Sequence, residues 1–213
     1  MLFELTELLT CPRCGPTVGL ILLVEELSER RVHRGWLGCS KCHHDYPVRE
    51  GVADLRLTPE SSVGPPAPPD EGDLPVKIAA LSGLGEGPGY LLIDTRLAHV
   101  AAEVADLLPE FEVIAFGMAP EGRSERQGVS WILADSYFPL VPYRLRAAAI
   151  APGGDGALVA AAVRVVGPGG RLVLFDATET DNAEVRESGL EVIARDGGTT
   201  VAERKDPFAP SEP

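Results

Sequence analysis

Long hydrophobic runs are missing from this sequence of 213 residues. A membrane-spanning helix needs about 18 or more consecutive apolar residues, whereas the longest apolar stretch here, 18–24, is short and contains a glycine. The first seven residues carry two glutamates and no positively charged side chain, whereas a secretory leader begins with positive charge. We therefore expect a cytoplasmic protein that does not insert into a membrane.

Lysine is scarce, with three residues, and positive charge is in deficit overall, so that the formal net charge is −13. The deficit is uneven, because residues 1–57 carry −1 and residues 58–213 carry −12. A surface that binds nucleic acid through its phosphates needs clustered Lys and Arg. We therefore expect no nucleic-acid partner, and instead a protein partner with a basic surface.

Cysteine is rare, and its four copies form two C-x-x-C pairs: Cys11, Cys14, Cys39 and Cys42. Each such turn directs two thiolates at one point, so two turns together are typical of a tetrahedral zinc site. The alternatives are two disulfides or four free thiols, but disulfides are rare in the cytosol. We predict a structural Zn²⁺ with four protein ligands, which leaves no coordination position open for catalysis.

The residues around these cysteines resemble the Trm112 family of small zinc-ribbon proteins. An apolar start precedes C-P-x-C-G, and the second pair opens C-x-x-C-x-x-x-Y-P-V-x-x-G-V. The resemblance covers residues 2–57 and implies a domain that binds and stabilises methyltransferases, sometimes fused to one in bacteria. The four cysteines match the metal-ligand positions of the family's four-cysteine members. We expect the nearby histidines, His33, His43 and His44, to be exposed.

The chain divides at a proline-rich stretch. We expect a zinc-ribbon domain over 1–57 and an extended, semi-rigid linker over 58–75, because prolines restrict the backbone and no apolar periodicity survives there. An α/β domain over 76–206 and a disordered tail over 207–213 complete this predicted organisation.

Helical and strand patterns alternate through the larger domain. Continuous apolar strands between helices indicate a mostly parallel, doubly wound sheet that is covered on both faces. Helices are expected over 76–84, 97–108 and 156–166, and strands over 90–94, 111–116, 130–134, 145–150 and 171–175, with a turn at 167–170 and a closing hairpin of 190–194 and 199–203.

This order resembles the class I S-adenosylmethionine-dependent methyltransferase fold over residues 76–205. The segment 162–175, with its G-P-G-G, is similar to the helix, turn and strand that lead into the family's fifth strand. The segment 134–140 is similar to the one after the third strand, where the family's acid faces the adenine. The resemblance implies that role for Asp135.

The expected cofactor loop departs from the family's D-x-G-x-G-x-G pattern. Asp94 matches its acid, but the three glycine positions hold bulkier residues, Arg96, Ala98 and Val100. Gly117 stands where the family has an acid for the ribose hydroxyls. A glycine-rich run does exist at 83–89, but it precedes the strand, whereas a cradling loop follows one. It becomes the loop only if the expected strand register is wrong.

Two main functions remain open. The first is a non-catalytic, zinc-binding scaffold or stabilising subunit, on a methyltransferase-like fold that has lost its cofactor loop. It predicts no catalytic residues and no S-adenosylmethionine. The alternative is an active methyltransferase with an atypical loop, acting on a small molecule or a protein, in which Asp94 and Asp135 would bind the cofactor. A third and weaker hypothesis is a binder of another nucleotide, with Arg96 on a phosphate.

Overall fold

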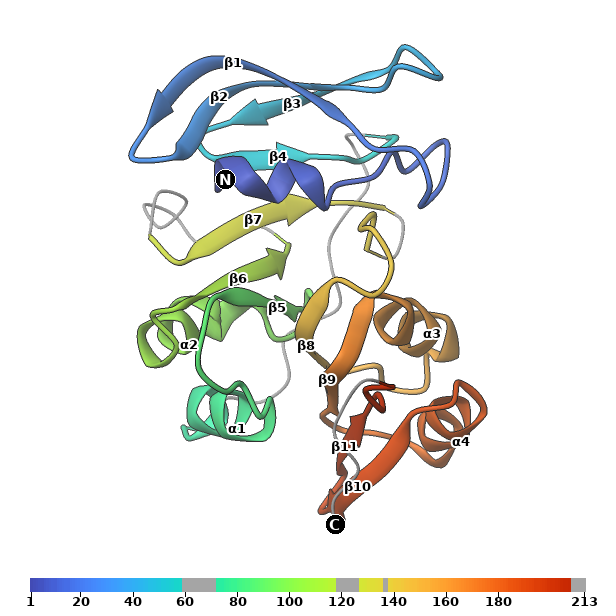
Figure 1. The fold of residues 1–213 in the computed structure, drawn as a ribbon. Helices are drawn as coiled ribbons and strands as arrows, with labels where there is room; N and C mark the ends of the chain where they lie inside the picture. The colour runs from blue at the N-terminus through green and yellow to red at the C-terminus, as the bar shows by residue number, and fades with distance from the viewer. Residues whose placement is uncertain (59–71, 118–126, 136–137, 208–213) are drawn as a thin grey trace.

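The computed structural model describes residues 1–58, 72–117, 127–135 and 138–207. Most of the predicted linker and nearly all of the predicted tail therefore lie outside the described residues. The described strands form one eleven-stranded sheet in the order β1-β2-β3-β4-β7-β6-β5-β8-β9-β11-β10 (Figure 1). The strands are β1 (Ile21–Ser28), β2 (Arg31–Gly38), β3 (Asp45–Arg49), β4 (Val52–Asp54), β5 (Gly89–Ile93), β6 (Phe111–Phe116), β7 (Val129–Leu133), β8 (Leu145–Ile150), β9 (Val166–Leu174), β10 (Glu191–Asp196) and β11 (Thr199–Glu203).

The central part of the sheet confirms the predicted doubly wound α/β fold. Strands β7, β6, β5, β8 and β9 are parallel neighbours in that order. The chain builds outward from β5 in one direction and then restarts at β8 on the other side. The order of winding therefore reverses between β5 and β8, and such a switch point is where ligands bind in folds of this class.

Helices cover both faces of this sheet (Figure 1). The helices are η1 (Phe3–Glu7), α1 (Leu74–Leu81), η2 (Ala98–Val100), α2 (Ala101–Leu107), α3 (Gly156–Val165) and α4 (Glu179–Glu187). Helices α1 and α2 pack with one buried cluster that includes Leu91 and Val113. Helices α3 and α4 pack with a second cluster on the other face, which includes Leu92 and Ile114. Successive strand residues therefore point to opposite faces, as the period of two requires.

The cysteine-containing segment continues the same sheet. Strand β4 pairs in parallel with β7, with Ala53 opposite Ile132. The second buried cluster also takes in side chains of this segment, among them Leu5 and Leu9. The predicted regions 1–57 and 76–206 thus share a sheet and a core. We call residues 1–58 the ribbon segment.

The ribbon segment covers sheet surface that the connection from β7 to β8 leaves open. The described residues of that connection contain no helix, although a crossover between parallel strands usually does. Leu9 instead forms a β-bridge with Leu140 in the connection. Hydrogen bonds of 2.8 Å from Thr10 N to Pro139 O and from Val141 N to Leu8 O flank this bridge.

Three sequence expectations about helices need correction. Helix α1 begins at Leu74, inside the predicted linker, because the Leu74 side chain is buried under the sheet. The helix expected over 97–108 is divided into the single turn η2 and α2. Helix α4 was missed because it is polar. Its sequence signal is a capping box, in which the Thr178 hydroxyl and the Asp181 carboxylate each accept a backbone N–H.

Two strand expectations also differ. Strand β2 was not predicted, and the G-P-G-G expected as a turn lies within β9. Its four residues bulge from the ladder with β8, because Leu145 pairs with Val166 and Ala147 with Arg171. Gly169 has a φ of 69°, and the other two glycines let neighbouring backbone approach closely. A Cβ on Gly167 would meet Tyr143 O at 2.8 Å, and one on Gly170 would meet Arg146 O at 2.8 Å. Close backbone approach therefore explains these glycines better than a reversal of the chain does.

A buried ion pair crosses the seam between the ribbon segment and the larger sheet. Arg31, on β2, donates to both carboxylate oxygens of Glu112, on β6, at 2.8 and 2.7 Å. Arg31 also donates to Val129 O at 2.9 Å, and the Ser130 hydroxyl donates to Glu112 at 2.6 Å. Both charged side chains are about nine-tenths buried, at 10% and 8% exposed. The charges are therefore paired and hydrogen-bonded, as burial requires.

Replacing Arg31 with methionine should strongly destabilise the protein. The variant leaves the Glu112 carboxylate buried without a counter-charge, which costs about 3–5 kcal/mol of unfolding free energy. Urea denaturation followed by fluorescence measures this loss.

Arg30→Met supplies the matched control, because Arg30 pairs with Glu4 but its side chain is 75% exposed. That exposed pair should contribute less than about 1 kcal/mol. Equal losses in the two variants would contradict the role given to the seam pair.

Candidate metal centre and switch-point pocket

The four cysteines meet at one place. Their Sγ atoms all lie within 4.8 Å of one another, and no disulfide joins them. The Cys11–Cys42 and Cys14–Cys39 Sγ distances are 3.7 and 3.8 Å. A tetrahedral Zn²⁺ with Zn–S bonds of about 2.3 Å requires S–S distances of about 3.8 Å. The residues therefore fit a four-thiolate zinc ion, which would supply a structural cross-link there.

The two cysteine turns share one backbone design. In the first, Gly15 N donates to Cys11 O at 2.9 Å, and in the second, His43 N donates to Cys39 O at 2.9 Å. Gly15 and His43 occupy the same position after their pairs, and both have positive φ, at 92° and 56°. His43 is exposed as expected, whereas His33 and His44 are half-buried, which corrects that expectation.

Polar groups beside Cys39 and Cys11 favour the ionised thiolates that a metal needs, whereas burial raises the pKa of Cys14 and of Cys42. Burial raises the pKa of Cys39, but backbone N–H groups of Cys42 and Lys41 outweigh it and lower this pKa to about 6. The buried Tyr46 hydroxyl lies 3.4 Å from Cys11 Sγ and can donate to it. Both contacts place positive dipoles at the sulfurs.

The metal centre is linked to the connection from β7 to β8. The Leu8–Thr10 stretch runs directly into Cys11 and holds the connection on one side. On the other side, the Arg164 guanidinium of α3 donates to Leu140 O and Phe138 O, at 2.8 Å each. The connection is thus held between the ribbon segment and α3.

Removing the metal should therefore loosen more than the cysteine turns. We expect one zinc per chain, and after chelation we expect faster hydrogen exchange at the amides of Thr10 and Val141. The Asn182 amide of α4, bonded to Thr178 O, should keep its rate. Hydrogen-exchange mass spectrometry of both forms tests this, and an unchanged Val141 amide would count against the link.

A second candidate site lies at the switch point. A pocket of about 270 Å³ opens at the carboxyl ends of the parallel strands. It is lined by Asp94, Thr95, Arg96, Phe116, Ala134, Asp135, Phe138, Ala151, Pro152, Asp155 and Leu158. The structure thus brings the two predicted cofactor-binding acids, Asp94 and Asp135, to one pocket. Its volume falls just below the range of about 300–1,000 Å³ that is usual for small-molecule sites.

Asp94 is committed to backbone groups. Its side chain accepts hydrogen bonds of 3.1 Å from Leu97 N and from Ala151 N, so it joins the loop after β5 to the loop after β8. The residue is 3% exposed. Burial raises its pKa to about 6, although the backbone N–H groups of Ala151 and Leu97 oppose the shift. Asp94 therefore links the two loops at the switch point by hydrogen bonds to their backbones.

Asp135 is tied to the ribbon segment. Its carboxylate accepts hydrogen bonds from Leu57 N at 2.6 Å and from Thr58 N at 3.1 Å. These two residues follow β4 and leave the ribbon segment at the rim of the pocket. Asp135, which was expected to face an adenine, therefore binds the backbone at the end of the ribbon segment.

The three non-glycine residues of the loop after β5 are built into the structure. Ala98 and Val100 are buried in the core below the loop. Arg96 crosses the switch point, because its guanidinium donates to Ala151 O at 2.9 Å and lies 3.8 Å from the Asp176 carboxylate. Of these three residues, Arg96 alone lines the switch-point pocket.

Gly117 ends β6 without offering a carboxylate. It has a φ of 132°, and a Cβ there would lie 3.5 Å from the Thr95 methyl group. His99 lies in the single turn η2 before α2 and is half-buried, with Nδ1 3.2 Å from Arg96 O and Nε2 buried without a partner among the described residues. The glycine-rich run 83–89 leads into β5, as expected, and does not follow a strand.

The seam residues were missed at the sequence level. The one signal was Glu112 in the otherwise apolar strand F-E-V-I-A-F, because a carboxylate in a buried strand needs a partner. Nothing in the sequence around Arg31 identifies it as the partner of Glu112, because the two residues are 81 positions apart.

No protein-family model matches the chain, and no curated protein sequence matches it. Solved structures that are similar to it include three methyltransferases. A precorrin-6y C5,15-methyltransferase of Geobacter metallireducens GS-15 is 15% identical with a TM-score of 0.46, over 62% of this chain and 88% of that one. The antibiotic-resistance methyltransferase Kmr is 15% identical with a TM-score of 0.42, over 68% and 96%.

The phosphoethanolamine N-methyltransferase 2 of Haemonchus contortus, solved with S-adenosylhomocysteine, is 12% identical with a TM-score of 0.47. The match covers 58% of this chain and 38% of that one. Identities and TM-scores this low say nothing about activity.

Among the described residues, no helix is long and apolar enough to cross a membrane.

The raised pKa of Asp94 predicts a pH dependence of stability. The folded state holds this proton up to pH about 6, whereas an unfolded aspartate releases it near 3.8, so stability falls as the pH rises between these values. Between pH 5 and 7 the loss should be about 1 kcal/mol. Urea denaturation should show that Asp94→Asn, though less stable throughout, lacks this component of the slope. Parallel pH profiles of unfolding free energy for the wild-type protein and Asp94→Asn would refute this role of Asp94.

Proposed function

We propose that this protein is a non-catalytic scaffold or stabilising subunit. In this proposal a Trm112-like zinc ribbon is fused to a methyltransferase-like domain that does not bind S-adenosylmethionine, and the protein acts in the cytoplasm. Its partner is a protein with a basic surface, because the chain has a net charge of −13. The zinc ion has a structural role.

The observation that carries this proposal is the Arg96 side chain across the switch point. Its hydrogen bond to Ala151 O spans the gap between the loops after β5 and β8. A cofactor that entered there would have to break this bond and separate the guanidinium from Asp176. Leu57 and Thr58 meanwhile engage Asp135 at the rim.

An active methyltransferase remains the second candidate. The observation in its favour is that Asp94 and Asp135 both line one pocket at the switch point. In that function Asp135 would have to release two backbone N–H groups to reach an adenine. The nucleotide-binding hypothesis has less support, because the Arg96 guanidinium already contacts a carbonyl and a carboxylate of the chain.

Titration calorimetry with S-adenosylmethionine and S-adenosylhomocysteine on the zinc-loaded protein separates the two candidates. We expect no heat of binding at millimolar ligand. Micromolar binding that Asp135→Asn weakens, and that the distant exposed variant Glu187→Gln does not, would establish a cofactor site. That result would replace the scaffold function by the methyltransferase one.

A further inference from the structure

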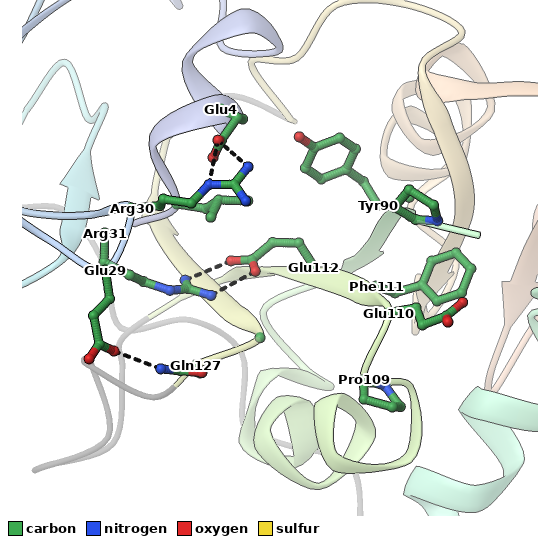
Figure 2. Close-up of a pocket in the computed structure, with 14 residues that line it drawn as sticks. Glu4, Glu29, Arg30, Arg31, Tyr90, Pro109, Glu110, Phe111, Glu112 and Gln127 are labelled. Atoms are coloured by element: carbon green, nitrogen blue, oxygen red, sulfur yellow. Dashed lines mark hydrogen bonds and ion pairs between the residues drawn. The ribbon is translucent and has the colours of Figure 1, made fainter. Parts of the chain in front are cut away.

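A pocket of about 600 Å³ lies at the other edge of the sheet, at the amino ends of β5, β6 and β7 (Figure 2). Its walls come from both sides of the seam, and we call it the seam pocket. It is lined by Leu2, Glu4, Glu29, Arg30, Arg31, Pro88, Gly89, Tyr90, Pro109, Glu110, Phe111, Glu112, Gln127 and Gly128. It is larger than the switch-point pocket and lies within the range of about 300–1,000 Å³ for small-molecule sites.

One wall of the seam pocket is aromatic. Tyr90 supplies the ring, and Figure 2 shows the Tyr90 hydroxyl pointing toward Glu4 and Arg30. Phe111 pairs with Gly89 and not with Tyr90, so its side chain points to the opposite face of the sheet, where it is 5% exposed. Tyr90 is half-buried, so its ring is partly accessible from the pocket. The face of such a ring attracts cations and packs against aliphatic chains.

The charged residues of the lining are mostly acidic. Four carboxylates, Glu4, Glu29, Glu110 and Glu112, face two guanidinium groups, Arg30 and Arg31. Burial raises the pKa of Tyr90, and the charges of Glu4 and Glu112 raise it further. The potential at the aromatic wall is therefore negative, which favours a positively charged ligand over an anion.

The chain itself shows that guanidinium groups fit here. Arg31 fills the floor through its two bonds to Glu112. Arg30 binds Glu4 at the mouth, where its side chain is 75% exposed. An exposed pair of this kind contributes little free energy and exchanges readily. The Glu4 carboxylate can therefore exchange Arg30 for an incoming cation, whereas the buried Glu112 carboxylate stays paired with Arg31.

The turn between β1 and β2 holds this mouth in place. Glu29 and Arg30 are its two central residues, and both have positive φ, at 47° and 63°. The Glu29 carboxylate accepts a hydrogen bond of 2.8 Å from Gln127 across the seam. The ribbon segment thus contributes the carboxylates of the mouth, and the larger sheet contributes the aromatic wall (Figure 2).

We propose that the seam pocket binds an organic cation, a guanidinium or ammonium group on an aliphatic stem. The stem packs on the Tyr90 ring, and the charge lies beside the Glu4 carboxylate. The shared chemistry belongs both to free amines and to arginine or lysine side chains of a protein. The proposal does not depend on whether the switch-point pocket holds a cofactor.

Titration of ¹⁵N-labelled, zinc-loaded protein with agmatine, and separately with a blocked Ala-Arg-Ala tripeptide, tests the proposal. We expect saturable shifts of the Tyr90, Glu112 and Gln127 amides, with a dissociation constant on the order of 1 mM, as suits a ligand of few atoms. Tighter binding of the tripeptide assigns the site to a protein side chain, and tighter binding of agmatine assigns it to a free amine. No saturable shift with either, or equal shifts with inorganic phosphate, would overturn the proposal.

Variants distinguish a specific site from general attraction to an acidic protein. Arg30→Ala frees Glu4 and should tighten binding about 2- to 5-fold, the range that an exposed ion pair can supply. Arg186→Ala removes another exposed arginine, paired with Glu179 on α4, and should change nothing. Tyr90→Leu should weaken binding with the fold intact by its NMR spectrum. Equal effects of Arg30→Ala and Arg186→Ala would also overturn the proposal.

Discussion

The parallel pairing of β4 with β7 is the contact on which the rest of the structure depends. Without it, β7 would be an exposed sheet edge, which is a site for unwanted strand pairing. Hydrogen bonds alone do not fix this register, because a strand of three residues offers few of them. The buried Arg31–Glu112 pair fixes it, since its bidentate geometry tolerates little displacement between β2 and β6.

The same junction reaches the switch point. The ribbon segment leaves β4 at the rim of the switch-point pocket, and there its backbone engages Asp135. Directly before Cys11, the backbone of Leu8 and Thr10 in the ribbon segment bonds to the connection from β7 to β8. A ligand at the switch point would have to compete with contacts that join the ribbon segment to the sheet. Asp135 therefore belongs both to the lining of this pocket and to the contacts that join the two regions.

Patterns local in the sequence were predictable, and contacts across it were not. The strand over 111–116 and the four cysteine ligands follow from periodicity and spacing, and the structure places both as expected. The G-P-G-G segment misled because glycines that admit a neighbouring backbone look like glycines that turn the chain. The ties of Asp135 to Leu57 and Thr58 have no sequence signal, because backbone N–H groups belong to every residue type except proline.

The distribution of charge gives the two ends of the sheet different chemistry. At the carboxyl ends, Arg96 donates to Ala151 O and lies 3.8 Å from the Asp176 carboxylate, whose side chain is 62% exposed. At the amino ends, Glu112 is neutralised by Arg31, but the carboxylates of the seam-pocket mouth are compensated only by exposed partners. Exposed pairs are screened and exchange with other ions, whereas buried pairs persist. The contacts between the ribbon segment and the larger sheet therefore rest on the buried Arg31–Glu112 pair, whereas the Arg30–Glu4 pair at the seam-pocket mouth is free to exchange.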